Sequence, residues 1–215
     1  MIIAPPPFPS IGVDCVTILN AQRCQALKAA GIGWVMRYTD TLTVVELETI
    51  HGEGMGAGFV SYAPEGGWEP SSTLGTTGAM GAVAALRALG VPSGVTLFAD
   101  LEGVSPTAPA DDVMAWGDSR ASMVKGSGYD PGVYVGAGAG LNAAQLYSLG
   151  FDKYWRSLSD VPTPACGYVL TQAYKTTIIG GTEVDVDYPQ YDWRGRMALL
   201  SWGSQKDVAT LPGLP

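Results

Sequence analysis

The sequence predicts an α/β protein whose strands close into an incomplete barrel of TIM type. Strand and helix patterns alternate up to about Gly150, and the segments after it look like strands with little helix between them. The count is about five βα units followed by three strands, as in a barrel that has lost its last helices. A doubly wound open sheet is the alternative fold. No G-x-G-x-x-G motif follows the first strand, which counts against a dinucleotide site.

The elements are read from side-chain periodicity and from capping residues. Asn20 is a plausible N-cap, and Thr43-x-x-Glu46 and Asn142-x-x-Gln145 have the pattern of capping boxes. The expected strands span 11–15, 33–38, 58–63, 94–103, 132–136, 153–157, 168–174 and 182–188. The expected helices span 21–30, 43–52, 77–89, 111–125 and 142–150.

Composition indicates a globular protein that does not bind nucleic acid, and the eight expected strands indicate one domain. Of the 215 residues, 47% are hydrophobic and 15% charged, as in a compact domain, and the net charge of -8 disfavours a phosphate-backbone partner. We expect a proline-rich N-terminal arm over 1–10, a barrel domain over 11–192 and a C-terminal tail over 193–215. The tail either packs across the bottom of the barrel or links to a partner.

The cysteines and the N-terminal residues bear on where the protein is made. Cys15, Cys24 and Cys166 are widely spaced and odd in number, so we expect free, buried thiols rather than a disulfide framework or a metal cluster. The first ten residues have no basic region and carry several prolines, unlike a signal peptide. No apolar run is long enough to cross a membrane. We therefore expect synthesis in the cytoplasm and no membrane insertion.

The strand expected over 94–103 ends in two carboxylates, and the rest of the chain is organised around it. Period-2 alternation places Asp100 and Glu102 on one face together with Phe98. Burial on both faces is typical of parallel sheets, and unpaired buried charge is costly there. The pair is therefore interpreted as two acids with separate pKa values, one protonated and one ionised. A strand end that has simply reached solvent is the structural alternative.

In a TIM-type barrel, the C-terminal ends of the strands form the active-site mouth. Acids and aromatic rings are expected to meet there, and each ring could equally be core packing. Such a mouth suits a carbohydrate, because sugar faces stack on aromatic rings while paired acids cleave a glycosidic bond. The residues expected at the mouth are Asp14, Arg37 or Tyr38, Tyr62, Asp100, Glu102, Tyr134, Trp155, Gln172 or Tyr174, Asp185 and Asp187.

Three acidic motifs in order resemble glycoside hydrolase family 25, the Chalaropsis-type muramidases. The motifs are Gly-Val-Asp14, Asp100-Leu-Glu102 and Val-Asp185-Val-Asp187, within about Ile11 to Tyr188. The chain is more similar still to the related glycoside-hydrolase-like domain of actinobacterial envelope proteins and phage lysins. Arg37-Tyr38 and the Ala-rich segment from Ala84 to Pro92 carry this closer likeness.

The resemblance implies roles for individual residues. Glu102 takes the place of the general acid, and Asp100 that of the neighbour that stabilises positive charge or orients an N-acetyl group. Asp14 and Asp185 match the two other acids. Asp187 stands where muramidases often have Asn.

The implied activity is hydrolysis of peptidoglycan glycan strands at the β-1,4 bond after N-acetylmuramic acid, without a cofactor or metal. We expect Glu102 to be protonated, and Asp100 and Asp185 to stay ionised. Retention, inversion and a substrate-assisted route all stay open. Arg37, Tyr38, Tyr62, Tyr134, Trp155, Gln172, Tyr174 and Asp187 are the expected substrate-binding residues.

Two other functions stay open. A non-catalytic glycan-binding module of a phage particle or cell envelope would keep the barrel mouth without turnover. A hydrolase in which the clustered acids bind Ca²⁺ or Mg²⁺ would be inactivated by EDTA. His51 is the only histidine, and we expect it to be a helix-terminal cation or a surface residue rather than part of a triad.

The expected partner is peptidoglycan at the bacterial cell wall, with the protein acting as a monomer. A phage lysin released through a holin, or carried in the virion, fits a chain without a signal peptide. A separate wall-binding or virion protein is a further expected partner, because the acidic charge does not favour the wall.

Overall fold

The structure is a computed structural model that describes residues 2–6, 10–173, 176–192 and 194–201. Its helices are α1 (Ala21–Ala29), α2 (Val44–Gly52), α3 (Ser72–Ala88), α4 (Ala110–Gly126) and α5 (Ala143–Ser148). Its strands are β1 (Ile2–Ala4), β2 (Ile11–Asp14), β3 (Ile32–Tyr38), β4 (Gly56–Ser61), β5 (Thr96–Leu101), β6 (Asp130–Val135), β7 (Lys153–Arg156), β8 (Leu170–Gln172), β9 (Thr177–Ile179), β10 (Thr182–Pro189) and β11 (Leu199–Ser201).

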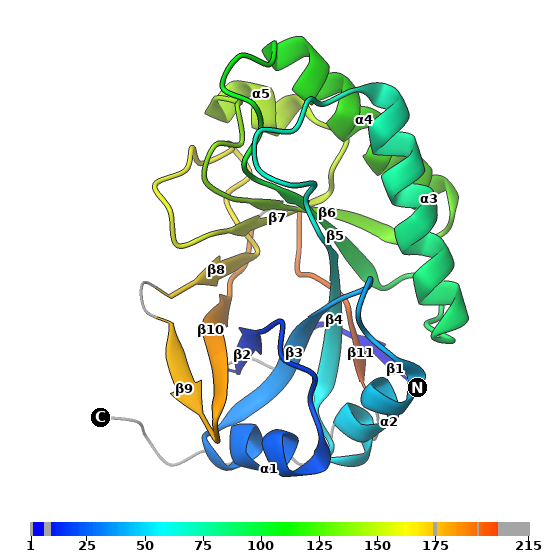
Figure 1. Cartoon of the computed structure of the whole chain (residues 1–215), viewed down its shortest axis with the longest axis vertical. Coiled ribbons are helices and arrows are strands. Elements are labelled where there is room, and N and C mark those ends of the chain that lie inside the picture. Colours follow the sequence, from blue (N-terminus) through cyan, green and yellow to red (C-terminus); the bar gives the residue numbers. More distant parts are fainter. Residues whose placement is uncertain (1, 7–9, 174–175, 193, 202–215) are drawn as a thin grey trace.

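Eight of these strands close into a barrel. Their order is β4-β3-β2-β10-β8-β7-β6-β5, and pairing of β4 with β5 completes the ring (Figure 1). Five βα units come first, and β7, β8 and β10 follow without a helix between them in the described residues. The predicted fold class is therefore confirmed.

One strand of the barrel runs in the opposite direction to the others. β10 pairs antiparallel with both β2 and β8, whereas the remaining barrel pairs are parallel. The short strand β9 forms a hairpin with β10, and Gly180 and Gly181 make its turn at positive φ. Periodicity in the sequence predicts a strand over 182–188 but not its direction.

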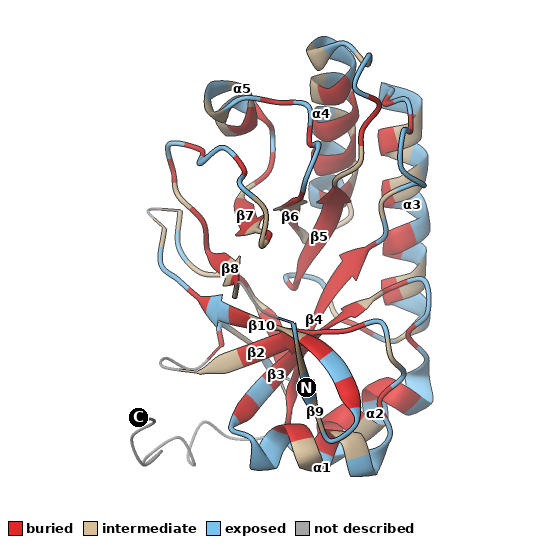
Figure 2. Ribbon diagram, turned by 60° about the vertical axis from the view of Figure 1, so that its left-hand side comes forward, coloured by how far each residue is buried: buried red, intermediate tan, exposed pale blue. Residues whose placement is uncertain are grey.

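The helices surround the part of the barrel that runs from β2 to β7. Their inward faces are buried and their outward faces exposed (Figure 2), and α5 packs on β7, where the Tyr154 hydroxyl donates to the Leu146 carbonyl. Within the described residues, no helix is both apolar enough and long enough to cross a bilayer.

Helix α3 begins at Ser72, earlier than the predicted residue 77, because Gly75 and Gly78 are packing positions. A Cβ atom on Gly75 would lie 2.2 Å from the Trp116 carbonyl oxygen of α4. These glycines let the two helices approach closely, and Ser71 caps α3 by accepting from the Leu74 N–H at 3.2 Å.

The lower end of the barrel is filled by apolar side chains and by the segment 194–201. Trp34, Met36 and Phe98 fill the interior together with Met197 and Leu199 from that segment. The Ala198 carbonyl accepts from the Thr96 N–H at 3.0 Å, and β11 joins the edge of β4 and pairs with β1. The described part of the tail therefore packs across the bottom of the barrel.

Several single-residue predictions can be compared with this fold. Cys15, Cys24 and Cys166 are free and buried, as predicted. His51 is not a surface cation: it is buried, and burial lowers its pKa, so the imidazole is neutral near pH 7. Thr43 does cap α2, but Glu46 turns away from the cap toward Arg37.

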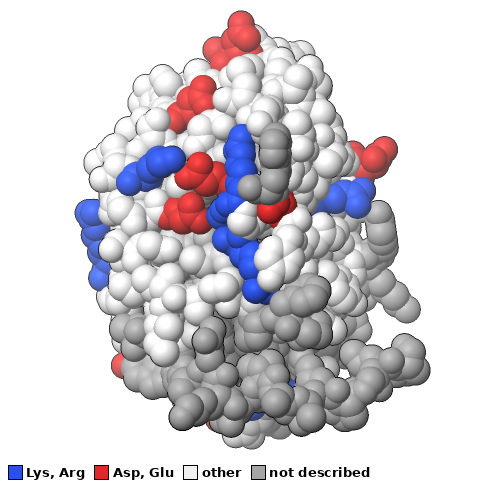
Figure 3. All heavy atoms as spheres, turned by 180° about the vertical axis from the view of Figure 1, so that it is seen from behind, with Lys and Arg blue, Asp and Glu red and all other residues white. Residues whose placement is uncertain are grey.

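Surface charges on the face opposite the view of Figure 1 are mixed in sign. Figure 3 shows basic side chains beside acidic ones near the middle of that face, surrounded by residues of neither kind. On that face the basic groups therefore do not form a patch of a single sign.

Candidate functional site

Strand β5 places two acids at the barrel mouth. Thr96, Phe98 and Asp100 face the interior, whereas Leu97 and Leu101 face the helices, which is the predicted alternation. Asp100 is 4% exposed, and Glu102 follows on the same side as a half-buried residue. Both acids line one cleft of about 420 Å³ together with Tyr62, Ala63, Pro64, Gly66, Gly103 and Ala137.

Strands β2 and β10 add acids to the same end of the barrel. Asp14 is the last residue of β2, and Asp185 lies directly opposite it in the antiparallel pair. Asp185 is half-buried and accepts from the Thr176 hydroxyl at 2.7 Å. Because β10 runs in reverse, its first half rather than its C-terminal end reaches the mouth.

Burial changes the protonation of these acids. Burial, and then the charge of Glu102, raises the pKa of Asp100 to about 8. Burial raises the pKa of Asp14 to about 7; the charges of Asp185 and Glu102 add to this, while a hydrogen bond from Gln172 opposes it. Burial also raises the pKa of Glu102. Near neutral pH, Asp100 holds a proton, contrary to the expectation that it stays ionised.

Two tyrosines form a stacked pair at the mouth. The rings of Tyr38 and Tyr62 are 3.9 Å apart between centroids and inclined by 12°. Tyr62 is 41% exposed and lines the acid cleft, whereas Tyr38 packs against the interior cluster. An exposed ring beside carboxyl groups offers the flat apolar face on which a sugar stacks.

Gln172 holds Asp14 in position. Its Nε2 donates to the Asp14 carboxylate at 2.7 Å, and its Oε1 accepts from the Tyr134 hydroxyl at 3.0 Å and from the Leu158 N–H at 3.2 Å. The amide therefore has one fixed orientation, and it links three strands of the barrel.

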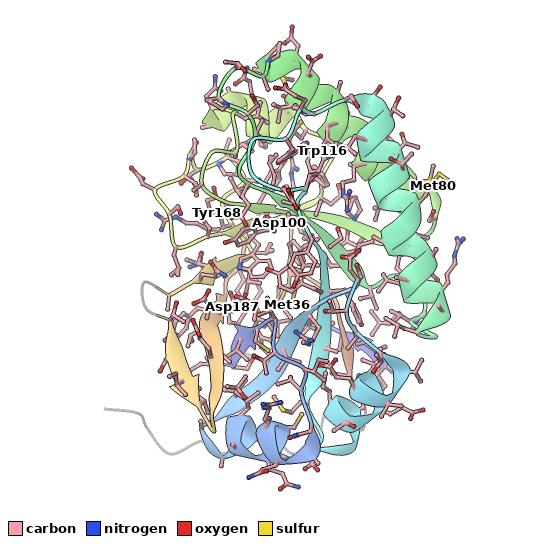
Figure 4. The ribbon with its side chains drawn as sticks, in the orientation of Figure 1. Met36, Met80, Asp100, Trp116, Tyr168 and Asp187 are labelled. Carbon is pink, nitrogen blue, oxygen red and sulfur yellow. The ribbon has the colours of Figure 1, made fainter. Side chains whose placement is uncertain are left out.

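Three predicted contact residues lie away from the surface of the mouth. Trp155 and Asp187 are 1% and 0% exposed; Trp155 packs edge-on against Phe98 and Tyr134, and Figure 4 shows Asp187 within the barrel. Arg37 is 0% exposed and points outward to the helix layer, where its Nε donates to Glu46 at 2.8 Å. The prediction of direct contact is therefore corrected for these three. Tyr174 lies outside the described residues.

Two positions that sequence reasoning did not select support the acids. A Cβ atom on Gly136 would lie 2.4 Å from Cβ and 2.5 Å from Oε2 of Glu102. The side chain of Glu102 therefore needs glycine there. The sequence signal for this position was the glycine that directly follows β6, the strand beside β5.

Arg120 of α4 is the second such position. It is 5% exposed, donates to the Ser61 hydroxyl and lies 5.5 Å above the Trp116 ring. Its positive charge opposes the upward shift in the pKa of Asp100. Helical periodicity predicts that Arg120 is on the buried side but not that it lies behind an acid.

The acids are suited to proton transfer. In the described part of the chain, no group of three or more His, Cys, Asp and Glu side chains is arranged to hold a metal ion. Carboxyl groups that hold protons near neutral pH beside an exposed ring are an arrangement that can protonate a glycosidic oxygen.

Comparison with solved structures shows the same fold in lytic enzymes. A family 25 glycosyl hydrolase from Bacillus anthracis superimposes with a TM-score of 0.58 and 14% identity, over 86% of this chain and 90% of that one. The catalytic domain of endolysin ply40 from bacteriophage P40 of Listeria monocytogenes gives 0.53 and 18%, over 84% and 93%.

The modular autolysin LytC from Streptococcus pneumoniae, solved with a synthetic peptidoglycan ligand, gives a TM-score of 0.56 and 15% identity, over 83% of this chain and 46% of LytC. No protein with a curated description matches the chain. The sequence pattern of the Rv2525c-like, glycoside hydrolase-like domain matches residues 25–205. The chain therefore belongs to the Rv2525c-like family of glycoside hydrolase-like domains, which is related in fold to the family 25 hydrolases.

Proposed function

We propose that this protein is a peptidoglycan glycan-strand hydrolase that cleaves the β-1,4 bond after N-acetylmuramic acid. The observation that carries the proposal is the cleft in which Asp100, Glu102 and the exposed Tyr62 meet. Asp14 and Asp185 approach the same end of the barrel from β2 and β10. The solved relatives of this fold include a phage endolysin and an autolysin bound to a peptidoglycan ligand.

Glu102 is the proposed proton donor. Asp100 lies deeper in the cleft than Glu102, so Glu102 is the acid that a leaving oxygen can reach. Burial of both groups keeps at least one proton on the pair near neutral pH. In this proposal Asp100 orients the sugar beside the reacting bond, and Asp14 and Asp185 stabilise the positive charge that develops on the ring.

Tyr38, Tyr62 and Tyr134 are the proposed substrate-contact residues. The Tyr38–Tyr62 stack offers a platform at the mouth, and Tyr134 reaches the same interior from β6. We place the action of the protein at the bacterial cell wall, as a monomeric lysin of phage origin delivered through a holin or in the virion. A separate wall-binding or virion protein belongs to the same proposal.

The test is the release of new reducing ends from purified peptidoglycan, with the fragments identified by mass after borohydride reduction. Wild-type protein should release fragments that end in reduced muramic acid. Glu102→Gln should lower the rate about 100- to 10,000-fold, the usual contribution of a general acid. Glu69→Gln is the matched control, since Glu69 is exposed and does not line the cleft.

Three results would contradict the proposal or replace it with another function. If folded wild-type protein releases no reducing ends from several peptidoglycan types, the hydrolase proposal is wrong. Retained binding of glycan strands by the same sample would then identify a glycan-binding module. Loss of activity in EDTA, restored by Ca²⁺ or Mg²⁺, would identify metal-dependent hydrolysis instead.

A further inference from the structure

Asp187 is a completely enclosed acid directly below the mouth. It is 0% exposed, and on β10 it stands between Gly12 of β2 and Gln172 of β8. Figure 4 shows it within the barrel, on the wall opposite Asp100. Its Oδ1 accepts from the Trp155 Nε1–H at 3.0 Å, whereas its Oδ2 has no donor among the described residues.

Asp14 and Asp187 are diagonal neighbours across the β2–β10 pair, and their carboxyl groups lie close enough to share a hydrogen bond. Two ionised carboxylates are both acceptors, so a hydrogen bond between them would require a proton on one of them. Asp14 already accepts from Gln172 at 2.7 Å and lies nearer the mouth. Asp187 has a single donor and no exposure, so ionisation is more costly at Asp187 than at Asp14.

We propose that Asp187 is a neutral carboxylic acid that donates a hydrogen bond to the Asp14 carboxylate and so fixes its position and charge. Asp187 is then a positioning residue, not a catalytic one. An Asn side chain also has one acceptor oxygen and a hydrogen-bond donor, so a neutral Asp can make the same two hydrogen bonds as an amide at this position. Only the catalytic consequence rests on the proposed hydrolase function.

The electrostatic surroundings agree with this geometry. Burial and the charge of Asp14 raise the pKa of Asp187 well above its ordinary value, the charge of Asp185 adds to this, and the Trp155 hydrogen bond opposes it. The groups that face the pair are Asp14 on β2, Asp185 on β10, Trp155 on β7 and Gln172 on β8. None of these four is a cation. The bond from Asp187 in turn lowers the pKa of Asp14.

A stability measurement tests the proton on Asp187 without any substrate. A buried acid that keeps its proton favours folding at low pH, and this contribution is lost as pH rises above the unfolded value of about 4. Asp187→Asn has no such proton to lose. Its melting temperature relative to wild type should therefore rise steadily from pH 4 to pH 8. A difference that is the same at every pH would overturn the proposal.

Infrared spectroscopy gives a second readout. The difference spectrum of wild type minus Asp187→Asn at pH 7 should contain the carbonyl stretch of one neutral carboxylic acid, and its absence would contradict the proposal. This readout concerns residue 187 itself, so the neutral Asp100 cancels between the two samples. This measurement needs only the Asp187→Asn variant, so it can be made even if Asp187→Leu does not fold.

The effect on Asp14 is tested by the pH profile of hydrolysis. Asp187→Asn should keep activity within about threefold of wild type, since its amide preserves the donor. Asp187→Leu should move the acidic limb of kcat/KM to higher pH, because Asp14 loses a donor. If the pH profiles of Asp187→Asn and Asp187→Leu are equal, Asp187 does not position Asp14. If neither the wild type nor the variants hydrolyse peptidoglycan, the proposed function is wrong. The stability and infrared results still show whether Asp187 is protonated.

Discussion

Two regions of this protein bury carboxylates in opposite ways. Outside the barrel, Glu46 of α2 is 2% exposed and accepts from Arg37 Nε and from the Leu19 N–H, both at 2.8 Å. Inside the barrel, Asp100 is 4% exposed, and among the described residues its Oδ1 has no hydrogen-bond donor and no Lys or Arg lies within ion-pair distance of it. The first acid is neutralised by a cation and the second by a proton.

The difference separates an ion-paired acid from an acid that holds a proton. A buried charge with a matched cation is held in one state, and it serves the packing of β3 against α2. A buried acid without a paired cation keeps its proton near neutral pH, because burial and the charge of Glu102 outweigh the opposing charge of Arg120. In this barrel, burial alone therefore does not determine the charge of a carboxyl group; the presence or absence of a paired cation does.

The largest expected effect comes from breaking the structural pair. Glu46→Ala leaves the Arg37 guanidinium buried without its carboxylate and should lower the free energy of unfolding by about 3–5 kcal/mol. Urea denaturation followed by circular dichroism measures this loss. The exposed Glu48 lies on the same helix, so Glu48→Ala is the matched control. Similar losses in both variants would mean that the ion pair does not stabilise the fold.

The protonated acids should make stability depend on pH in a particular direction. The pKa values of Asp14 and Asp100 are raised to about 7 and about 8, so the folded state binds more protons than the unfolded state above about pH 4. The free energy of unfolding should therefore fall by a few kcal/mol between pH 4 and pH 8. Asp100→Asn should reduce this fall. An unchanged fall would show that Asp100 is ionised in the folded protein.

A smaller effect should follow from moving Glu102 without removing it. In Gly136→Ala the new methyl group would overlap the Glu102 side chain, since its position is 2.4 Å from Glu102 Cβ. A displacement of about 1 Å can lower the rate of hydrolysis about 100-fold. Gly81→Ala on α3 is the control, because no atom lies within 4 Å of its added Cβ. Full activity in Gly136→Ala would mean that the position of Glu102 is not critical.

The sequence predicts the fold class because local patterns determine most of the barrel. Alternation on 94–103 places Asp100 inside correctly, and Asn142 and Gln145 form the predicted capping box. The short strands β1, β9 and β11 were not predicted, because three-residue strands depend on partners that are distant in the chain. The direction of β10 was missed for a similar reason, since period 2 is the same in both directions.

The site was less predictable than the fold, because contacts rather than residue types decide its roles. Arg37 and Tyr38 are adjacent on β3 and so face opposite sides, and only Tyr38 reaches the interior. The resemblance to the glycoside-hydrolase-like domain matched both residues and did not show which of them faces the interior. Nothing in the local sequence distinguishes Asp187, which lies under the mouth, from Asp185, which lies at its rim. The depth of a side chain in a barrel follows from strand stagger, which the sequence does not show.

The late position of strand β10 in the chain also affects when the site can exist. Asp14 is near the start of the chain, yet the Gln172 amide that orients it comes 158 residues later, and Asp185 and Asp187 come later still. Contacts so distant in sequence are made late and slowly in folding. While the chain is being synthesised, the early βα units can pack without a complete set of acids. The acid cluster is therefore assembled only when the barrel closes.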